Sequence, residues 1–544
     1  MRKFVGALTA IAAFTGSASA ADIAGRPYTK APAPVAAVYN WTGFYVFGGA
    51  GGGLWAADSN VQSTGVIGPF GAFGPAGTLL TRDQRLGGSG WFGTVGAGYD
   101  WQFNGRWVAG VFADGQFGEI SGSLSDPFFG IEGREKLRTS YAAGVRLGYL
   151  VAPNVLSYVN AGYSGSEWSG TSQTVIPVGV GIPTGVQTTT GSFHRDGIFV
   201  GGGVENNLDI FGIAAPGWFM KTEYRSAFYD RISRSETFAP GNGFGFGGPA
   251  VPVGPTGNAI TFKPWNQTIS TSLVYRFNST GSASAADIAA RPYTKAPAPV
   301  ATVYNWTGVY VFGGAGGGLW AADSNVQSTG VIGPFGGFGP AGTLLTRDQR
   351  LGGSGWFGTV GVGYDWQFNG RWVTGVFADG QFGDIRGSLT DVFGFFEGRE
   401  KLRTSYAAGV RLGYLVAPNV LSYVNAGYSG SEWSGTSLVS LAPAGGPVFA
   451  TTGSFHRDGW FVGGGVENNL DIFGIAASGW FMKTEYRSAF YDRISLSETL
   501  APGNGVAPAG LLTGTAVTFK PWNQTISTSL VYRFNSGGAV VAKY

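Results

Sequence analysis

The sequence predicts an all-β protein in which antiparallel strands close into a transmembrane barrel. Three observations support this prediction: a period-two alternation of apolar and polar residues, a regular exchange of tight turns and long loops, and an unusual composition. Of 544 residues, 95 are glycine, while aromatic residues make up 15% and charged residues only 12%. A soluble domain usually carries about 25% charged residues. Many glycines and aromatics with few charges favour tightly packed strands that have one apolar face.

The N-terminus has the three parts of a secretory signal peptide. Arg2 and Lys3 form a basic start, residues 4–14 are mostly apolar, and Ala18-Ser19-Ala20 provides the small–x–small pattern that signal peptidase recognises. The apolar stretch is too short for a transmembrane helix, which needs ~20 residues. We therefore expect an exported protein that is cleaved between Ala20 and Ala21.

The segment that follows the leader, residues 21–40, is rich in proline and alanine. This composition favours an extended, unpaired backbone. We expect a periplasmic spacer here, and a contact with the cell-wall peptidoglycan is the alternative role.

The next part of the chain alternates with the period of a β-strand. In residues 136–151, for example, Leu137, Tyr141 and Val145 share one face with other mostly apolar residues, whereas Lys136 and Arg138 share the other. Similar alternation predicts eight strands, at 41–57, 89–103, 106–120, 136–152, 155–169, 194–210, 218–232 and 263–277.

The connections between these strands alternate in length. Asn104-Gly105, Pro153-Asn154 and residues 212–217 are short, and Asn-Gly is the strongest short hairpin signal. The other connections are long and rich in Gly, Pro and Ser. Short turns at one end and long loops at the other are typical of outer-membrane barrels, which must close because a bilayer offers the backbone no hydrogen-bond partners. A soluble β-sandwich or propeller is the alternative fold.

Aromatic residues near the expected strand ends suit the two interfacial girdles of such a barrel. They are Trp41, Tyr45, Trp55, Trp91, Trp101, Trp107, Tyr141, Tyr149, Trp218 and Phe277.

The whole pattern then repeats. Residues 41–277 and 306–534 match almost residue for residue, and "TGSASAADIA" occurs both at 15–24 and at 280–289. We interpret this as a tandem duplication whose breakpoint lay inside the leader, so the second site is an inert remnant. The predicted organisation is a signal peptide at 1–20, a Pro/Ala-rich segment at 21–40, barrel copy 1 at 41–278, a periplasmic linker at 279–305, barrel copy 2 at 306–535 and a tail at 536–544. The sixteen strands predict two tandem eight-stranded barrels, with one sixteen-stranded barrel as the alternative.

Several motifs closely resemble a known family. "ADIAGRPYTKAPAPVAAVYNWTGFYVFGGAGGG", "GYDWQFNGRWVAGVFAD", "LRTSYAAGVRLGYLVAPNVLSYVNAGY", "GGGVENNLD", "KTEYR" and "TSLVYRF" resemble the small outer-membrane β-barrel surface proteins of alphaproteobacteria. The resemblance covers essentially the whole mature chain, twice. It implies an eight-stranded barrel per copy and residence in the outer membrane. Members are called porin-like or surface proteins, and some are described as binding haem. The two copies depart from the single-barrel pattern.

The alternation also places charged side chains toward the lumen. An eight-stranded interior is just wide enough for side chains to fill it. These charges therefore predict a buried ion-pair network. The alternative is that they line a path for protons or solutes. In copy 1 they are Asp100, Asp114, Arg138, Arg146, Glu205, Lys221, Glu223, Arg225 and Arg276; in copy 2 they are Asp365, Asp379, Arg403, Arg411, Glu467, Lys483, Glu485, Arg487 and Arg533.

Other kinds of chemistry are poorly supported. Cysteine is absent, which excludes disulfides and thiolate metal sites, and a formal charge of +3 is too low for nucleic-acid binding. The two histidines, His194 and His456, lie in "SFHRDG" without a converging nucleophile or second acid. We therefore expect no enzyme activity, no metal site and no cofactor; haem contact is retained only through the family resemblance.

Alternating aromatic residues close each copy, as in the assembly signal of many outer-membrane proteins. The candidates are Tyr275, Phe277, Tyr532 and Phe534, together with Tyr544 at the end of the chain. The expected partners are outer-membrane lipid and lipopolysaccharide and the barrel assembly machinery. The expected function is a structural surface barrel with an occluded or weakly conducting lumen. A general diffusion porin, and a barrel that binds haem or a host surface, are the alternatives.

Overall fold

The computed structural model describes residues 39–277 and 304–534, except for residue 72 and the stretches 180–183, 209–212, 214, 244–249, 442–445, 471–474 and 476. The predicted signal-peptide site at Ala18, Ala20 and Ala21 lies outside these residues, as does Tyr544. Within the described ranges, no helix has the length and apolar character needed to cross a membrane.

The described part of the first copy is built from β-strands. They are β1 (Gly43–Ser63), β2 (Gln84–Phe103), β3 (Trp107–Asp126), β4 (Ile131–Ala152), β5 (Val155–Trp168), β6 (Thr171–Val175), β7 (Val186–Thr190), β8 (Phe193–Asn207), β9 (Trp218–Tyr229), β10 (Ile232–Phe238) and β11 (Pro255–Phe277).

The second copy repeats this series. Its strands are β12 (Gly308–Ser324), β13 (Val326–Ser328), β14 (Gln349–Phe368), β15 (Trp372–Asp391), β16 (Phe396–Ala417), β17 (Val420–Trp433), β18 (Ser437–Ser440), β19 (Val448–Thr451), β20 (Phe455–Asn469), β21 (Trp480–Tyr491), β22 (Ile494–Leu500) and β23 (Leu512–Phe534).

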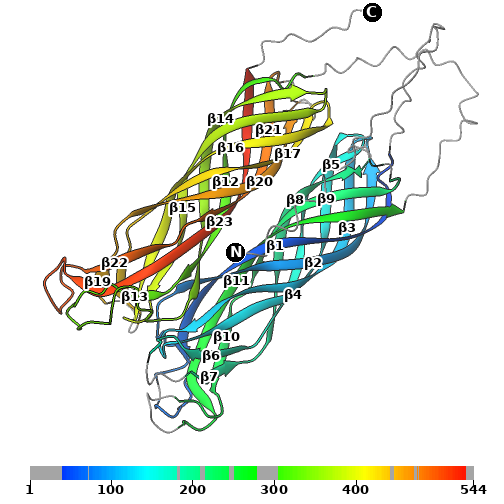
Figure 1. Ribbon diagram of the computed structural model, residues 1–544. Helices are drawn as coiled ribbons and strands as arrows, with labels where there is room; N and C mark the ends of the chain where they lie inside the picture. The colour runs from blue at the N-terminus through cyan, green and yellow to red at the C-terminus, as the bar shows by residue number, and fades with distance from the viewer. Residues whose placement is uncertain are drawn as a thin grey trace, which may run out of the picture. The chain divides into compact units, whose positions relative to one another are not determined.

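All strand pairs are antiparallel, and the pairs of each copy form a cycle (Figure 1). In the first copy the order is β1, β2, β3, β4, β5, β8, β9 and β11, and β11 pairs back with β1 from Phe277↔Phe44 to Asn258↔Ser63. In the second copy β12, β14, β15, β16, β17, β20, β21 and β23 are paired in the same way. The predicted all-β antiparallel barrel fold is confirmed.

The short turns gather at one end of each cycle, which we call the turn end, and the long connections lie at the opposite loop end. Asn104 and Gly105 both have positive φ, 48° and 73°, and the pairing of Phe103 with Trp107 leaves three residues in this connection. Asn-Gly adopts these angles at low cost, because asparagine tolerates the left-handed region and glycine has no Cβ.

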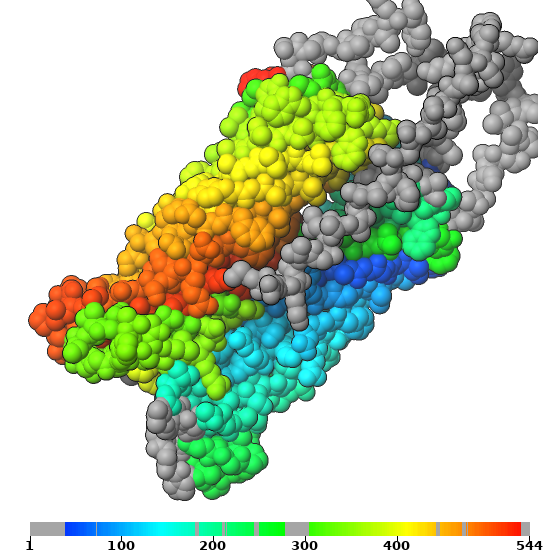
Figure 2. Space-filling view, in the orientation of Figure 1, coloured from blue at the N-terminus to red at the C-terminus, as the bar shows by residue number. Residues whose placement is uncertain are grey.

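The outer surface carries a band of apolar side chains nearer the turn end. In β2, β4, β5 and β8, Val95, Val145, Val159 and Ile198 are 56–64% exposed, and Trp91 is 72% exposed. On the face that Figure 2 shows, the strands of each copy form a closely packed outer surface. Exposed apolar residues in such number are costly in water and stable against lipid.

Three of the aromatic residues expected in the girdles lie elsewhere. Trp41, Tyr45 and Trp55 are only 0–1% exposed and point into the barrel, whereas Trp91 and Trp101 are exposed on its outside. An aromatic side chain fills a lumen as well as it suits a lipid interface, so the residue type alone did not decide the face.

The strands also extend beyond the expected spans at the loop end. β11 begins at Pro255 rather than near 263, and β6, β7 and β10 continue the sheet there, with β6 pairing with β4 and β10 with β11. Beyond the apolar band neither face of a strand meets lipid, so the simple alternation that revealed the strands is lost.

The predicted assembly-signal residues close each cycle at the turn end. Tyr275 pairs with Val46 and Trp218, and Phe277 lies opposite Phe44. Phe534 lies opposite Val309 in the second copy. Their role in assembly stays a prediction.

Candidate functional site

Four charged residues from four strands form one cluster inside the first copy. Arg146 of β4 lies between Asp100 of β2 and Glu205 of β8, with Nε 2.8 Å from Asp100 Oδ1 and Nη1 3.1 Å from Glu205 Oε2. Arg276 of β11 joins the same two carboxylates, at 2.8 Å from Asp100 Oδ2 and 2.7 Å from Glu205 Oε1. Two guanidinium groups therefore balance two carboxylates, and both carboxylate side chains are fully buried.

A second cluster lies beside it on β9 and β3. Arg225 donates to both oxygens of Asp114, at 2.8 and 2.6 Å, and to Glu223 at 2.8 Å. Lys221 lies 3.6 Å from Glu223, and the Tyr158 hydroxyl donates to Glu223 at 2.8 Å. Bidentate Arg–carboxylate pairs are the strongest of such contacts.

The second copy repeats both clusters. Arg411 and Arg533 pair with Asp365 and Glu467, and Arg487 binds Asp379. Lys483 lies 3.6 Å from Glu485. The two copies have nearly the same sequence, so the second set of contacts is not independent support for the first. We call these two clusters of each copy the charged layer; every member is 8% exposed or less.

Two of the predicted lumen residues are not in the charged layer. Arg138 and Arg403 are exposed, because the registers of β4 and β16 shift between Leu137 and Thr139 and between Leu402 and Thr404. A β-bulge adds one residue and so exchanges the inward and outward faces on either side of it. Below the bulge Arg146 points inward, and above it Leu137 does so instead. The prediction that Arg138 and Arg403 line the lumen is wrong for this reason.

Aromatic side chains cover the charged layer on its turn side. The Trp41 Nε1–H donates to the Pro153 carbonyl at 3.1 Å, and the Arg276 guanidinium carbon lies 4.4 Å from the centroid of the Trp41 ring. Trp41 also contacts Phe219 edge-on at 5.1 Å. Such cation–π contacts are stronger where water is excluded. Alternation of residue types indicated the layer but not this cap, since Trp41 precedes the first strand.

A second aromatic group covers the charged layer on its loop side. Trp55, Trp168 and Phe262 meet edge-on, with centroids 5.2–5.6 Å apart, and Ile120 and Leu137 belong to the same apolar cluster. Trp320, Trp433 and Phe519 form the same group in the second copy. The lumen of each copy therefore holds a cap, a charged layer and an apolar layer in succession.

The two histidines lie on the outer surface near the loop end. His194 Nδ1 is 3.0 Å from Glu167 and Nε2 is 2.9 Å from Asp196, and the ring stacks on Tyr141. The hydrogen bond to Asp196 raises the pKa of His194. Within the described ranges, no group of three or more His, Cys, Asp or Glu side chains is arranged to hold a metal ion. Haem contact stays an expectation.

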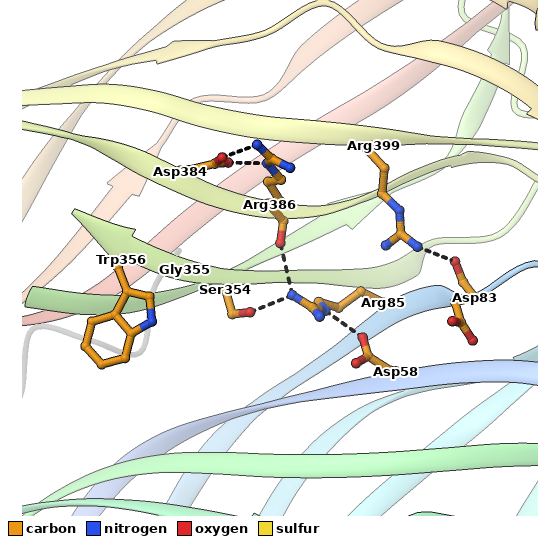
Figure 3. Close-up of a pocket in the computed structure, with 9 residues that line it drawn as sticks. All are labelled: Asp58, Asp83, Arg85, Ser354, Gly355, Trp356, Asp384, Arg386 and Arg399. Atoms are coloured by element: carbon orange, nitrogen blue, oxygen red, sulfur yellow. Dashed lines mark hydrogen bonds and ion pairs between the residues drawn. The ribbon is translucent and has the colours of Figure 1, made fainter.

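Other charges lie in ion pairs at the loop end. Arg85 lies 2.8 Å from Asp58 in the first copy, and Arg386 pairs with Asp384 in the second (Figure 3). These pairs are partly exposed, so each contributes at most about 1 kcal/mol to stability.

Buried glutamates near the loop end make stability depend on pH; burial raises the pKa of Glu132 and of Glu397 to about 7. Burial likewise raises the pKa of Glu135 and of Glu400 to about 7, although Thr171 and Ser169, and their equivalents Thr436 and Ser434, donate to them. The folded protein thus binds protons that the unfolded chain has released between about pH 5 and 7, and its stability falls as pH rises through that range. We expect the temperature at which the folded gel mobility is lost to be highest near pH 5 and lower at pH 8.

The double variant Glu135→Gln/Glu400→Gln should weaken this pH dependence, because glutamine imitates the protonated acid. Glu119→Gln, which changes an exposed partner of Lys136, is the matched control and should retain it. An unchanged slope in the double variant would show that these two groups are not the source.

No protein-family model matches the chain. Over 162 residues the chain is 31% identical to the 31 kDa outer-membrane immunogenic proteins of Brucella melitensis biotype 1 and Brucella suis biovar 1. The matched region is 28% of this chain and 62% of each relative, so the chain spans less than two thirds of these relatives.

Solved structures give only loose similarities. A Pseudomonas aeruginosa FadL homologue is 11% identical, with 91% of each chain covered and a TM-score of 0.25. The Ralstonia pickettii toluene transporter TbuX is 10% identical, with 91% of this chain and 90% of that one covered and a TM-score of 0.23. Neisserial surface protein A is 13% identical, with 42% of this chain and 98% of that one covered and a TM-score of 0.20. At such low scores nothing about function follows.

Proposed function

We propose that this chain is an outer-membrane surface protein made of two eight-stranded barrels, and that the lumen of each barrel is occluded. Its role is structural and non-enzymatic: it displays the long connections of the loop end to the outside. The band of exposed apolar side chains supports residence in a membrane. The predicted signal peptide and the relative named as an outer-membrane protein support the outer membrane in particular.

The main support for an occluded lumen is the charged layer, which is enclosed between two aromatic groups. Arg146, Asp100, Glu205 and Arg276 satisfy one another across the barrel, and their side chains are 0–2% exposed. Solute passage would need these pairs to separate, which leaves buried charges uncompensated at a cost of about 3–5 kcal/mol for each broken pair. Trp41 on one side and Trp55 on the other add apolar barriers.

The strand pairings support two barrels rather than one. Each copy pairs its first strand with its own last strand, β1 with β11 and β12 with β23. Closing a cycle locally also costs less chain entropy than joining strands at the two ends of the protein. Outer-membrane lipid and lipopolysaccharide are the proposed partners of the apolar band, and the barrel assembly machinery is the proposed partner during insertion.

Conductance in planar lipid bilayers tests the occluded lumen. We expect the purified, refolded protein to give no large, stable current steps at protein concentrations at which a general diffusion porin, used as the positive control, gives many. Reproducible steps of one size would overturn the occluded barrel and favour a diffusion porin. Insertion is checked independently by reconstituting the protein in vesicles of the same lipid and measuring its protection from protease.

A further inference from the structure

Two carboxyl groups meet inside the first copy near its loop end, above the apolar layer. Asp126 is the last residue of β3, and Glu236 lies in β10; they are 0% and 1% exposed and close enough to hydrogen-bond one another. Asn258 of β11, also 0% exposed, donates from Nδ2 to Asp126 Oδ2 at 3.1 Å. Three strands that are distant in sequence thus bring three oxygen-bearing side chains together.

The hydrogen bonds around this group leave an excess of acceptors. Asp126 Oδ1 accepts from the backbone N–H groups of Phe128 and Phe129, at 2.7 and 3.1 Å. Oδ1 of Asn258 and both oxygens of Glu236 are buried without a hydrogen bond of good geometry. The buried Gln173 amide, whose Nε2 also lacks an acceptor, lies near enough to Glu236 to lower the pKa of that carboxyl, although burial raises the pKa more. A proton shared between the two carboxyls would satisfy one of these three oxygens. Each buried acceptor left alone costs about 1–3 kcal/mol, and more if charged.

The carboxyl groups of Asp126 and Glu236 have no ion-pair partner among the described residues. Among the ion pairs of the described residues, none joins Asp126 or Glu236 to a lysine or arginine, whereas every carboxylate of the charged layer has such a partner. The amide nitrogen of Asn258 faces Asp126, because a carboxylate accepts hydrogen bonds and an amide oxygen cannot donate one. The amide oxygen of Asn258 is left without a donor.

We propose that Asp126, Glu236 and Asn258 hold a divalent cation inside the loop end of the first copy. Two carboxylates and an amide carbonyl are hard oxygen ligands, which favour Ca²⁺; Mg²⁺ demands a stricter octahedral geometry and keeps more of its water. The cation ties the end of β3 to β10 and β11. It also braces the turn after Asp126, whose Phe129 ring packs against Phe70 and Phe238 at 6.1 and 6.3 Å.

The second copy provides a natural comparison. Asp391 and Glu498 correspond to Asp126 and Glu236, but threonine, Thr515, replaces Asn258. The Thr515 hydroxyl donates to Glu498 Oε2 at 2.9 Å, so only Oε1 of Glu498 is left without a donor. The second copy thus has no amide oxygen, and one buried acceptor without a donor where the first copy has three. We expect it to bind the cation much more weakly.

Calcium binding by the full-length protein tests this inference. The protein is refolded in detergent, stripped with a chelator and titrated with Ca²⁺ in a calorimeter at pH 7.5. We expect one site per chain in the wild type, an affinity at least tenfold lower in Glu236→Gln, and an unchanged site in the matched control Glu498→Gln. Asn258→Thr, which introduces the residue that the second copy uses, should also lower the affinity.

Folded gel mobility is measured for every variant, and if Glu236→Gln fails to fold, Asn258→Thr decides the matter. No binding by the wild type at millimolar Ca²⁺ would overturn the proposal and leave a carboxyl pair with a shared proton. It would equally be overturned if both folded variants kept wild-type affinity, or if Glu498→Gln alone abolished the site.

Discussion

Replacing Arg146 with methionine is expected to lower the free energy of unfolding of the first copy by about 3–5 kcal/mol. The substitution removes one of two guanidinium groups that neutralise Asp100 and Glu205, whose side chains are fully buried. Removing one partner of a buried ion pair is costly because the remaining charge cannot return to water. Arg276 still touches both carboxylates, but one positive charge then faces two negative ones.

The same strand provides the matched control. Arg138→Met also removes an arginine from β4, but Arg138 is exposed, so its loss should change stability by less than about 0.5 kcal/mol. Unfolding of the full-length protein in urea, followed by tryptophan fluorescence and folded gel mobility in lipid vesicles, measures both. Arg411→Met should act on the second copy as Arg146→Met acts on the first. Equal effects of Arg146→Met and Arg138→Met would contradict the charged layer as a stabilising element.

The first half of the chain, residues 1–278, is expected to fold without the second. Its β1 and β11 pair from Phe44↔Phe277 to Ser63↔Asn258. The cycle is therefore closed without a strand from the other copy. We expect this half, expressed with its leader, to reach the membrane in a form that resists protease and changes gel mobility on heating.

A shorter piece that ends at residue 254 is the control. It lacks β11 and leaves the edges of β1 and β9 open, and an open sheet edge is not tolerated in lipid. We expect it to aggregate or to be degraded. If residues 1–278 behaved like this truncated piece while the full chain folded, closure would depend on the second copy. That result would favour one sixteen-stranded barrel and the porin alternative.

Much of the fold could be predicted from the sequence because lipid imposes a simple pattern. A strand between lipid and a packed lumen must alternate, so Val145 and Arg146 reveal their faces by residue type alone. Asn104-Gly105 revealed its turn because few other residue pairs adopt that geometry. The charged layer followed from the same alternation: of the nine residues predicted to line the first lumen, all except Arg138 lie in it.

What the sequence by itself determined is therefore the period, the turns, the internal repeat and the polarity of the lumen near the turn end. Only the tertiary structure decided the rest. A single bulge beside Arg138 exchanged the two faces of β4, and bulges leave no clear mark on an alternating pattern. Trp55 and Trp91 look alike in sequence, yet one fills the lumen and the other faces outward. Asp126, Glu236 and Asn258 are adjacent only because β3, β10 and β11 converge at the loop end, and no local pattern records which distant strands will meet.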